Sequence, residues 1–130
     1  MLPEKFEQLV IAAVAGMPVE FKELLENVDI CVQDWPSRQQ LKSVGLQDKY
    51  DLLGLYEGMP RTHRDQGYNL VLPDKITIFQ NTIESAFVSD TEIEREVRQV
   101  VLHEIAHHFG LYDRRLEQIE AEKRSKHRRP

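Results

Sequence analysis

The sequence predicts a single α+β domain in which a small mixed sheet packs against two long helices. Three observations lead to this prediction. A chain of 130 residues has about the commonest size of one domain. Apolar residues recur at helical spacing near both ends of the chain. Short segments with strand-like patterns, bounded by Gly and Pro, lie between those two regions.

The first helix is expected over Pro3–Ala15, because the apolar side chains of this stretch fall on one helical face. Gly16 and Pro18 then end it. A short second helix is expected within 19–28. Only a weak helical turn is expected within 37–50, where the pattern is poor.

Three segments are predicted to be strands, namely 29–35, 52–58 and 75–80. The first alternates polar and apolar residues, and the third places Ile76 and Ile78 on one face. The polar segment 61–69 is expected to be a loop.

The longest helix is expected to begin after Ser89 and to end at Gly110. Ser89 followed three residues later by Glu92 is a capping-box signature, and no Gly or Pro interrupts the chain before Gly110. The first half of this helix is amphipathic, whereas apolar residues nearly surround its second half. We therefore expect the helix to run from the surface into the core.

His103, Glu104 and His107 lie in this second half. Residues four apart on a helix share one face, so the two imidazoles can bind the same metal ion. A metal ion would also remove the cost of burying them without partners. Glu104 points beside that ion, which suits a base that takes a proton from metal-activated water.

Gly110 and Asp113 follow His107 by three and six positions and extend the pattern of potential metal-site residues. Glycine readily adopts the left-handed conformation that ends a helix, and such a turn could return Asp113 to the metal as a third ligand. Three protein ligands with an open fourth position are typical of catalytic zinc. The sequence therefore predicts one zinc ion per chain, bound by His103, His107 and Asp113.

At these residues the chain resembles a known family. HEIAHHFGLYD resembles the H-E-x-x-H-x-x-G-x-x-H/D element of the metzincins. With LLGLYEGMP and LPDKITIFQ upstream, the chain is similar to small bacterial zincin-like metallopeptidases, sometimes called minimal zincins. The resemblance covers about residues 6–116 and implies zinc, a zincin-like fold and peptide hydrolysis, most simply as an endopeptidase. No methionine follows Asp113, so the Met-turn of true metzincins is absent.

A peptide substrate is expected to add to an exposed strand edge beside the metal through main-chain hydrogen bonds. Two strands qualify by position, 52–57 and 75–80. The resemblance favours 52–57, because the edge strand of zincins is usually the penultimate one before the metal helix. Gly54 supports this choice, since glycine often marks a close approach, although it could equally relieve crowding. The predicted substrate edge consists of Leu52, Leu53, Gly54, Leu55, Tyr56 and Glu57.

Two other functions stay open. A metal-dependent ribonuclease family carries an H-x-x-x-H-x-x-G-x-D-H element, but here Glu104 follows the first histidine and position 114 is arginine. A zinc-stabilised binding module without turnover is the second alternative. A closed fourth coordination position would support that module.

The net charge of −5 is divided unevenly along the chain. Residues 1–113 hold 10 Lys and Arg against 19 Asp and Glu, whereas 114–130 hold 7 against 3. The basic tail 123–130 could contact nucleic acid or anionic lipid, but a disordered, solvated terminus is the simpler interpretation. We therefore expect the domain to span 1–122, with nucleic acid not among its partners.

Cysteine content and hydropathy bear on location. Cys31 is the only cysteine of the sequence, so an internal disulfide is excluded and a reducing cytoplasm fits best. The apolar stretch 9–17 follows the acidic residues Glu4 and Glu7 and is too short to cross a bilayer. We expect a cytoplasmic protein without a membrane span.

Overall fold

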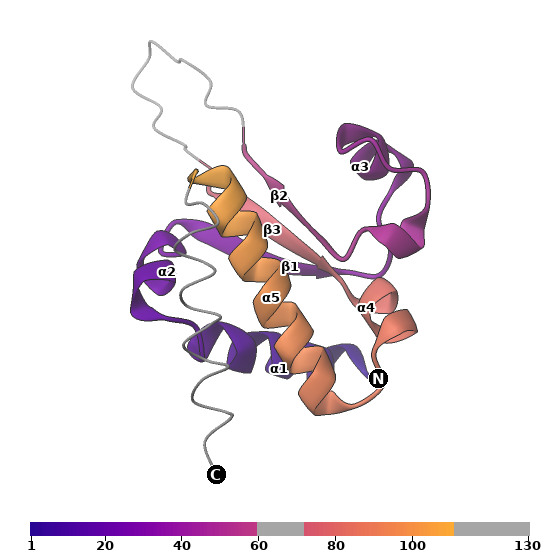
Figure 1. Cartoon of the computed structure of the whole chain (residues 1–130), viewed down its shortest axis with the longest axis horizontal. Helices are drawn as coiled ribbons and strands as arrows, with labels where there is room; N and C mark the ends of the chain where they lie inside the picture. The colour runs from indigo at the N-terminus through magenta and orange to yellow at the C-terminus, as the bar shows by residue number, and fades with distance from the viewer. Residues whose placement is uncertain (60–71, 111–130) are drawn as a thin grey trace.

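The structure is a computed structural model that describes residues 1–59 and 72–110 (Figure 1). The predicted loop 61–69, the proposed ligand Asp113 and the tail 123–130 lie outside the described residues. The elements follow the order α1 (Pro3–Ala15), α2 (Val19–Leu24), β1 (Val28–Gln33), α3 (Arg38–Ser43), η1 (Lys49–Asp51), β2 (Gly54–Glu57), β3 (Asp74–Phe79), α4 (Gln80–Ala86) and α5 (Asp90–His108).

The strands form a three-stranded mixed sheet in the order β1-β3-β2. β1 runs parallel to β3 and places Ile30 beside Ile76, whereas β2 runs antiparallel and places Tyr56 beside Ile76. Among the described strands, β2 pairs on one side only and therefore lies at an edge. The predicted α+β class with a small mixed sheet is confirmed.

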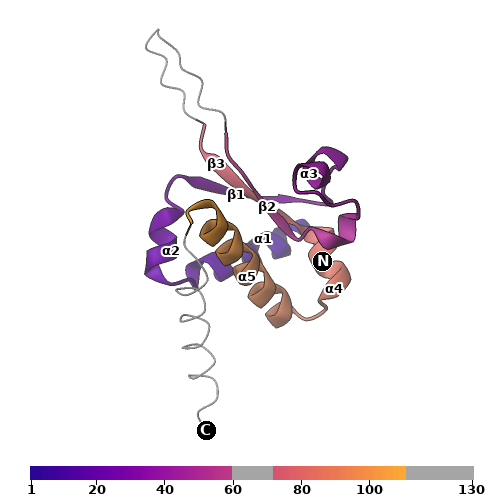
Figure 2. The ribbon, with the colours of Figure 1, turned by 45° about the horizontal axis from the view of Figure 1, so that its top comes forward.

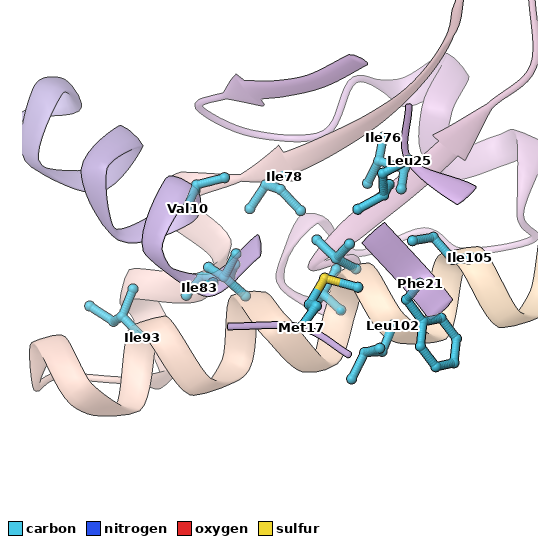
Figure 3. Packing of buried hydrophobic residues seen from close by; sticks show 14 of the residues in the cluster. Val10, Met17, Phe21, Leu25, Ile76, Ile78, Ile83, Ile93, Leu102 and Ile105 are labelled. Atoms are coloured by element: carbon cyan, nitrogen blue, oxygen red, sulfur yellow. The ribbon is translucent and has the colours of Figure 1, made fainter. Parts of the chain in front are cut away.

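The helices α1 and α5 cover one face of the sheet (Figure 2). Side chains alternate across a strand, so Ile76 and Ile78 of β3 both point into the layer between sheet and helices, where each is fully buried. They belong to one cluster with Ile83 of α4 and Leu102 of α5, and Figure 3 shows Ile76 next to Leu25. This layer is the main core of the domain.

The helix α3 covers part of the opposite face near β2. Leu41 of α3 packs there with Leu52, Leu55 and Phe79 in a second, smaller core. The weak helical turn expected within 37–50 is a short, well-capped helix, because Ser37 and Gln40 form a complete capping box. Ser-x-x-Gln is the local signal that would have revealed this helix.

The helices at the two ends of the chain begin and end close to where the sequence predicts. α1 has the expected bounds and buries Phe6, Val10 and Ala13. In front of α5, the Ser89 hydroxyl accepts a hydrogen bond from the Glu92 backbone N–H at 3.2 Å. The described helices include none long and apolar enough to cross a membrane.

One prediction about α5 was wrong: its second half does not end surrounded by the core. Leu102, Ile105 and Ala106 are buried, yet His103 and His107 are exposed. With about 100° between successive residues, the three apolar side chains share one arc of the helix and the imidazoles occupy the other. The helix therefore buries one side and presents its histidines at the surface.

Candidate active site

The C-terminal turns of α5 place the two imidazoles and the carboxylate of the HEIAH segment beside the strand β2. His103 and His107 are exposed, whereas Glu104 is partly buried between the helix and the strand. Since His103 and His107 are one helical turn apart, both present their rings on the same face. This is the arrangement that the sequence predicts for the metal-facing side of the helix, apart from the exposure of the rings.

Glu104 is held against the backbone of β2. Burial raises the pKa of its carboxyl group, while the electrostatic effect of His107, a hydrogen bond from the backbone N–H of Tyr56 and the electrostatic effect of His103 lower it. The net effect is a carboxylate whose pKa lies above the ordinary value. Such a shift makes the group a stronger base.

The main-chain N–H and C=O groups along β2 point alternately toward β3 and away from it. The backbone N–H of Phe79 donates to the carbonyl of Leu53 at 3.0 Å, so Leu53 faces β3. Antiparallel pairs alternate between hydrogen-bonded and non-hydrogen-bonded positions, and consequently Gly54 and Tyr56 direct their N–H and C=O groups away from β3. The hydrogen bond from Tyr56 to Glu104 agrees with this direction. The edge of β2 therefore faces the carboxylate.

A groove of about 450 Å³ follows this edge. It joins the end of α5, the strand β2 and the turn after α3. Its lining residues are Val44, Leu46, Leu52, Leu55, Tyr56, Gly58, Glu104, His107 and His108. Of the six residues predicted as the substrate edge, Gly54–Glu57 form β2, and three residues line the groove, namely Leu52, Leu55 and Tyr56.

The reason for glycine at position 54 is the packing of α5. A β-carbon at Gly54 would overlap the side chain of Val100. Gly54 thus relieves crowding between the strand and the helix, which was the alternative interpretation of this residue. The edge position of β2 rests on its strand pairing and not on Gly54.

A polar cluster fixes the end of β2 to the end of α5. The hydroxyl of Tyr56 donates to Oδ2 of Asp74 at 2.8 Å, and the backbone N–H of Met59 donates to Oδ1 at 2.9 Å. The His108 ring stacks on the Tyr56 ring at 3.8 Å, with its Nε2 3.7 Å from Asp74 Oδ2. Burial, followed by the hydrogen bond and the charge of Asp74, raises the pKa of Tyr56 to about 12.

Sequence reasoning missed this cluster. Tyr56 and Asp74 are 18 positions apart, and only the antiparallel pairing of β2 with β3 brings them together. The stacking of His108 on Tyr56 gives this histidine a structural contact at the end of α5.

The end of α5 has the geometry expected for a chain reversal. Gly110 has a φ of +64°, in the left-handed region that favours glycine. Within residues 1–59 and 72–110, no three His, Cys, Asp or Glu side chains are grouped as a metal site. The described part of the site therefore supplies two imidazoles, and the proposed third ligand, Asp113, lies beyond it.

An exposed histidine pair, a partly buried carboxylate and an open strand edge thus lie together at the end of α5. Residues 25–123 match the family model of the zincin-like metallopeptidases, and the chain belongs to that family. No curated protein matches the chain. Membership supports a metallopeptidase function in general and implies a metal ion and peptide substrates.

Proposed function

We propose that this protein is a zinc-dependent endopeptidase that cleaves an extended peptide bound along the outer edge of β2. The observation that carries the proposal is the position of Glu104. Its carboxylate adjoins two exposed imidazoles on one side and accepts a hydrogen bond from the edge strand on the other. The base, the metal-ligating groups and the peptide-binding edge thus meet at one point.

The residues present fit a zinc ion. His103 and His107 are exposed on one helical face, and imidazole is a common zinc ligand. On this proposal Asp113 completes the ligand set after the turn at Gly110, with one ion per chain. When bound, zinc acts as a Lewis acid that polarises a carbonyl group and lowers the pKa of water to about 7.

The protein's own groups perform the remaining steps. Glu104 takes a proton from the attacking water and passes it to the leaving amine. The Tyr56 backbone N–H orients the carboxylate for this transfer. The outward main-chain groups of Gly54 and the carbonyl of Tyr56 bind the peptide backbone, so the substrate needs no free terminus at this strand.

The proposal also covers the extent of the catalytic domain and the cellular location. We propose that 1–122 form the catalytic domain and that 123–130 are an appended basic tail. We also propose that the protein works in the cytoplasm, where its exposed Cys31 stays reduced. The ribonuclease alternative gains no support from the groove, because its described lining residues include no lysine or arginine.

The variant Glu104→Gln tests the function. The amide cannot accept a proton, so cleavage of a proteome-derived peptide library should fall by about 10²–10⁴-fold while zinc content is unchanged. Zinc is measured by metal analysis, and cleavage by mass spectrometry of the products. Glu96→Gln, a partly buried carboxylate on the same helix, is the matched control.

Comparable turnover by Glu104→Gln at full zinc occupancy would contradict the role of this base. Equal zinc binding by wild type and variant, with no cleavage by either, would instead favour a zinc-stabilised binding module.

A further inference from the structure

The groove along β2 has two chemically different sides. Since side chains alternate along a strand, Leu55 and Tyr56 point to opposite faces of the sheet. Leu55 belongs to the small core under α3, whereas the Tyr56 ring stacks on His108 at the end of α5. One side of the groove is therefore apolar and the other contains the ionisable groups.

The apolar side is formed by the segment that directly follows α3, by β2 and by the two residues that precede β2. Val44 is 44% exposed at its rim, Leu46 is partly buried, and Leu52 and Leu55 are 8% and 7% exposed below them. We define the apolar wall as Val44, Leu46, Leu52 and Leu55. None of these four side chains carries a charge or a hydrogen-bonding group.

A peptide on the β2 edge meets both sides in turn. An extended chain rises about 3.3 Å per residue and directs successive side chains to opposite faces. The cut bond must lie near Glu104 and His107, which are on the polar side. Of the two residues that flank this bond, one consequently faces the apolar wall.

We propose that the apolar wall selects substrates with an aliphatic or aromatic side chain at one of the two residues that flank the cut bond. This inference rests on the proposed peptidase function. A charged side chain at that residue would lose hydration without gaining a partner from the four residues of the apolar wall, whereas an apolar one removes its own surface and that of Val44 from water.

The test uses the zinc-loaded full chain and a set of peptides with the sequence otherwise fixed. The two residues that flank the cut bond are varied in turn among Leu, Phe, Ser, Lys and Glu, and mass spectrometry locates the cut. At one of the two positions, kcat/KM should be at least about tenfold higher for Leu or Phe than for Glu or Lys.

A charge placed on the wall should reverse this selection. Val44→Lys should raise the kcat/KM of the Glu peptide relative to the Leu peptide by about tenfold or more, since the lysine can pair with the carboxylate. Val88→Lys is the matched control, because Val88 is 90% exposed in the segment between α4 and α5 and does not line the groove. Leu46→Ala provides a second variant, with a smaller loss of the preference for Leu.

The outcomes separate the inference from the function on which it rests. If the peptides are cleaved without an apolar preference, or if Val44→Lys leaves the preference unchanged, selection by the apolar wall is refuted. Neither result contradicts the proposed peptidase function. If wild type cleaves none of the peptides, the peptidase proposal fails. Binding of the same peptides, labelled and followed by fluorescence anisotropy, then decides the inference: equal affinity for Leu and Glu peptides overturns it.

Discussion

Both halves of α5 bury one side against the core, but they present different side chains on the side that faces away from it. In the first half, Ile93 and Val97 are 1% and 0% exposed and pack in the main core. In the last turns, His103 and His107 face outward at the surface. The comparison shows how a small domain divides one helix between stability and chemistry. The buried side fixes the helix axis along both halves, through Ile93 in the first and Ile105 in the second, so the outward side can hold imidazoles in place without enclosing them.

The sharpest way to break this comparison is to truncate one side chain in each half. Ile93→Ala should lower the free energy of unfolding by about 2–5 kcal/mol through loss of buried surface and a residual cavity. His103→Ala should change the stability of the metal-free protein by less than about 0.5 kcal/mol. It should nevertheless weaken zinc binding at least about tenfold, as should Asp113→Ala.

Urea unfolding in the presence of a chelator measures the stabilities, and competition with a zinc indicator measures the affinities. A His103→Ala variant as unstable as Ile93→Ala would show that the imidazole supports the fold. Unchanged zinc affinity in Asp113→Ala would remove that residue from the site.

A second prediction concerns the boundary between the halves, where Val100 packs against Gly54. In Gly54→Ala the new methyl group overlaps Val100, so the strand and the helix must separate. We expect a loss of about 1–3 kcal/mol in the free energy of unfolding, together with lower turnover because Glu104 moves from the strand edge.

The matched variant is Gly58→Ala. Among the described residues, its β-carbon would meet only Oδ1 of Asp74, at an ordinary contact distance of 3.8 Å. A stability change below about 0.5 kcal/mol is expected there. Equal destabilisation of the two variants would argue against tight packing of α5 on β2.

The smallest effect is expected from a change at Tyr56. Its ring stacks on His108 at the end of α5, and its hydroxyl donates a hydrogen bond to Asp74 of β3. Its pKa is raised to about 12 in the folded protein, against about 10 when unfolded. The stability that this group contributes is thus fully present below pH of about 10, and is lost as the pH rises to about 12. Tyr56→Phe should flatten this part of the stability profile.

Ultraviolet absorbance titration measures the phenol directly. The Tyr56→Phe variant should lack the phenol that ionises at about pH 12, and its loss of stability at neutral pH should be about 1 kcal/mol, as for one hydrogen bond. A Tyr56 phenol that ionises near pH 10 in the wild type would mean that its contact with Asp74 is not maintained in solution.

Local signals predicted those features that depend on neighbours in the sequence. The helical spacing around Phe6 and Val10 located α1, and Ser89 and Gly110 marked the ends of α5. The spacing of His103 and His107 likewise places both on one face of any helix. These predictions needed no knowledge of the tertiary structure.

The remaining features depend on contacts between distant segments. The exposure of His103 is an exception, because the helical spacing of Leu102, Ile105 and Ala106 already places these apolar side chains on one arc of the helix and His103 on another. The bond between Tyr56 and Asp74 requires the register of β2 on β3. The function of Gly54 required the position of Val100 on a helix that follows much later in the chain.

The exposure of the histidine pair also bears on which metal the protein acquires. Two accessible imidazoles one helical turn apart form a chelate for several divalent ions, and copper binds such nitrogen ligands more tightly than zinc does. The pair therefore does not encode a preference for zinc. Any preference for zinc must arise from the remaining ligands and from the metals that the cell supplies. Protein purified on nickel resin or from copper-rich medium will accordingly need stripping and reloading before its native metal can be assigned.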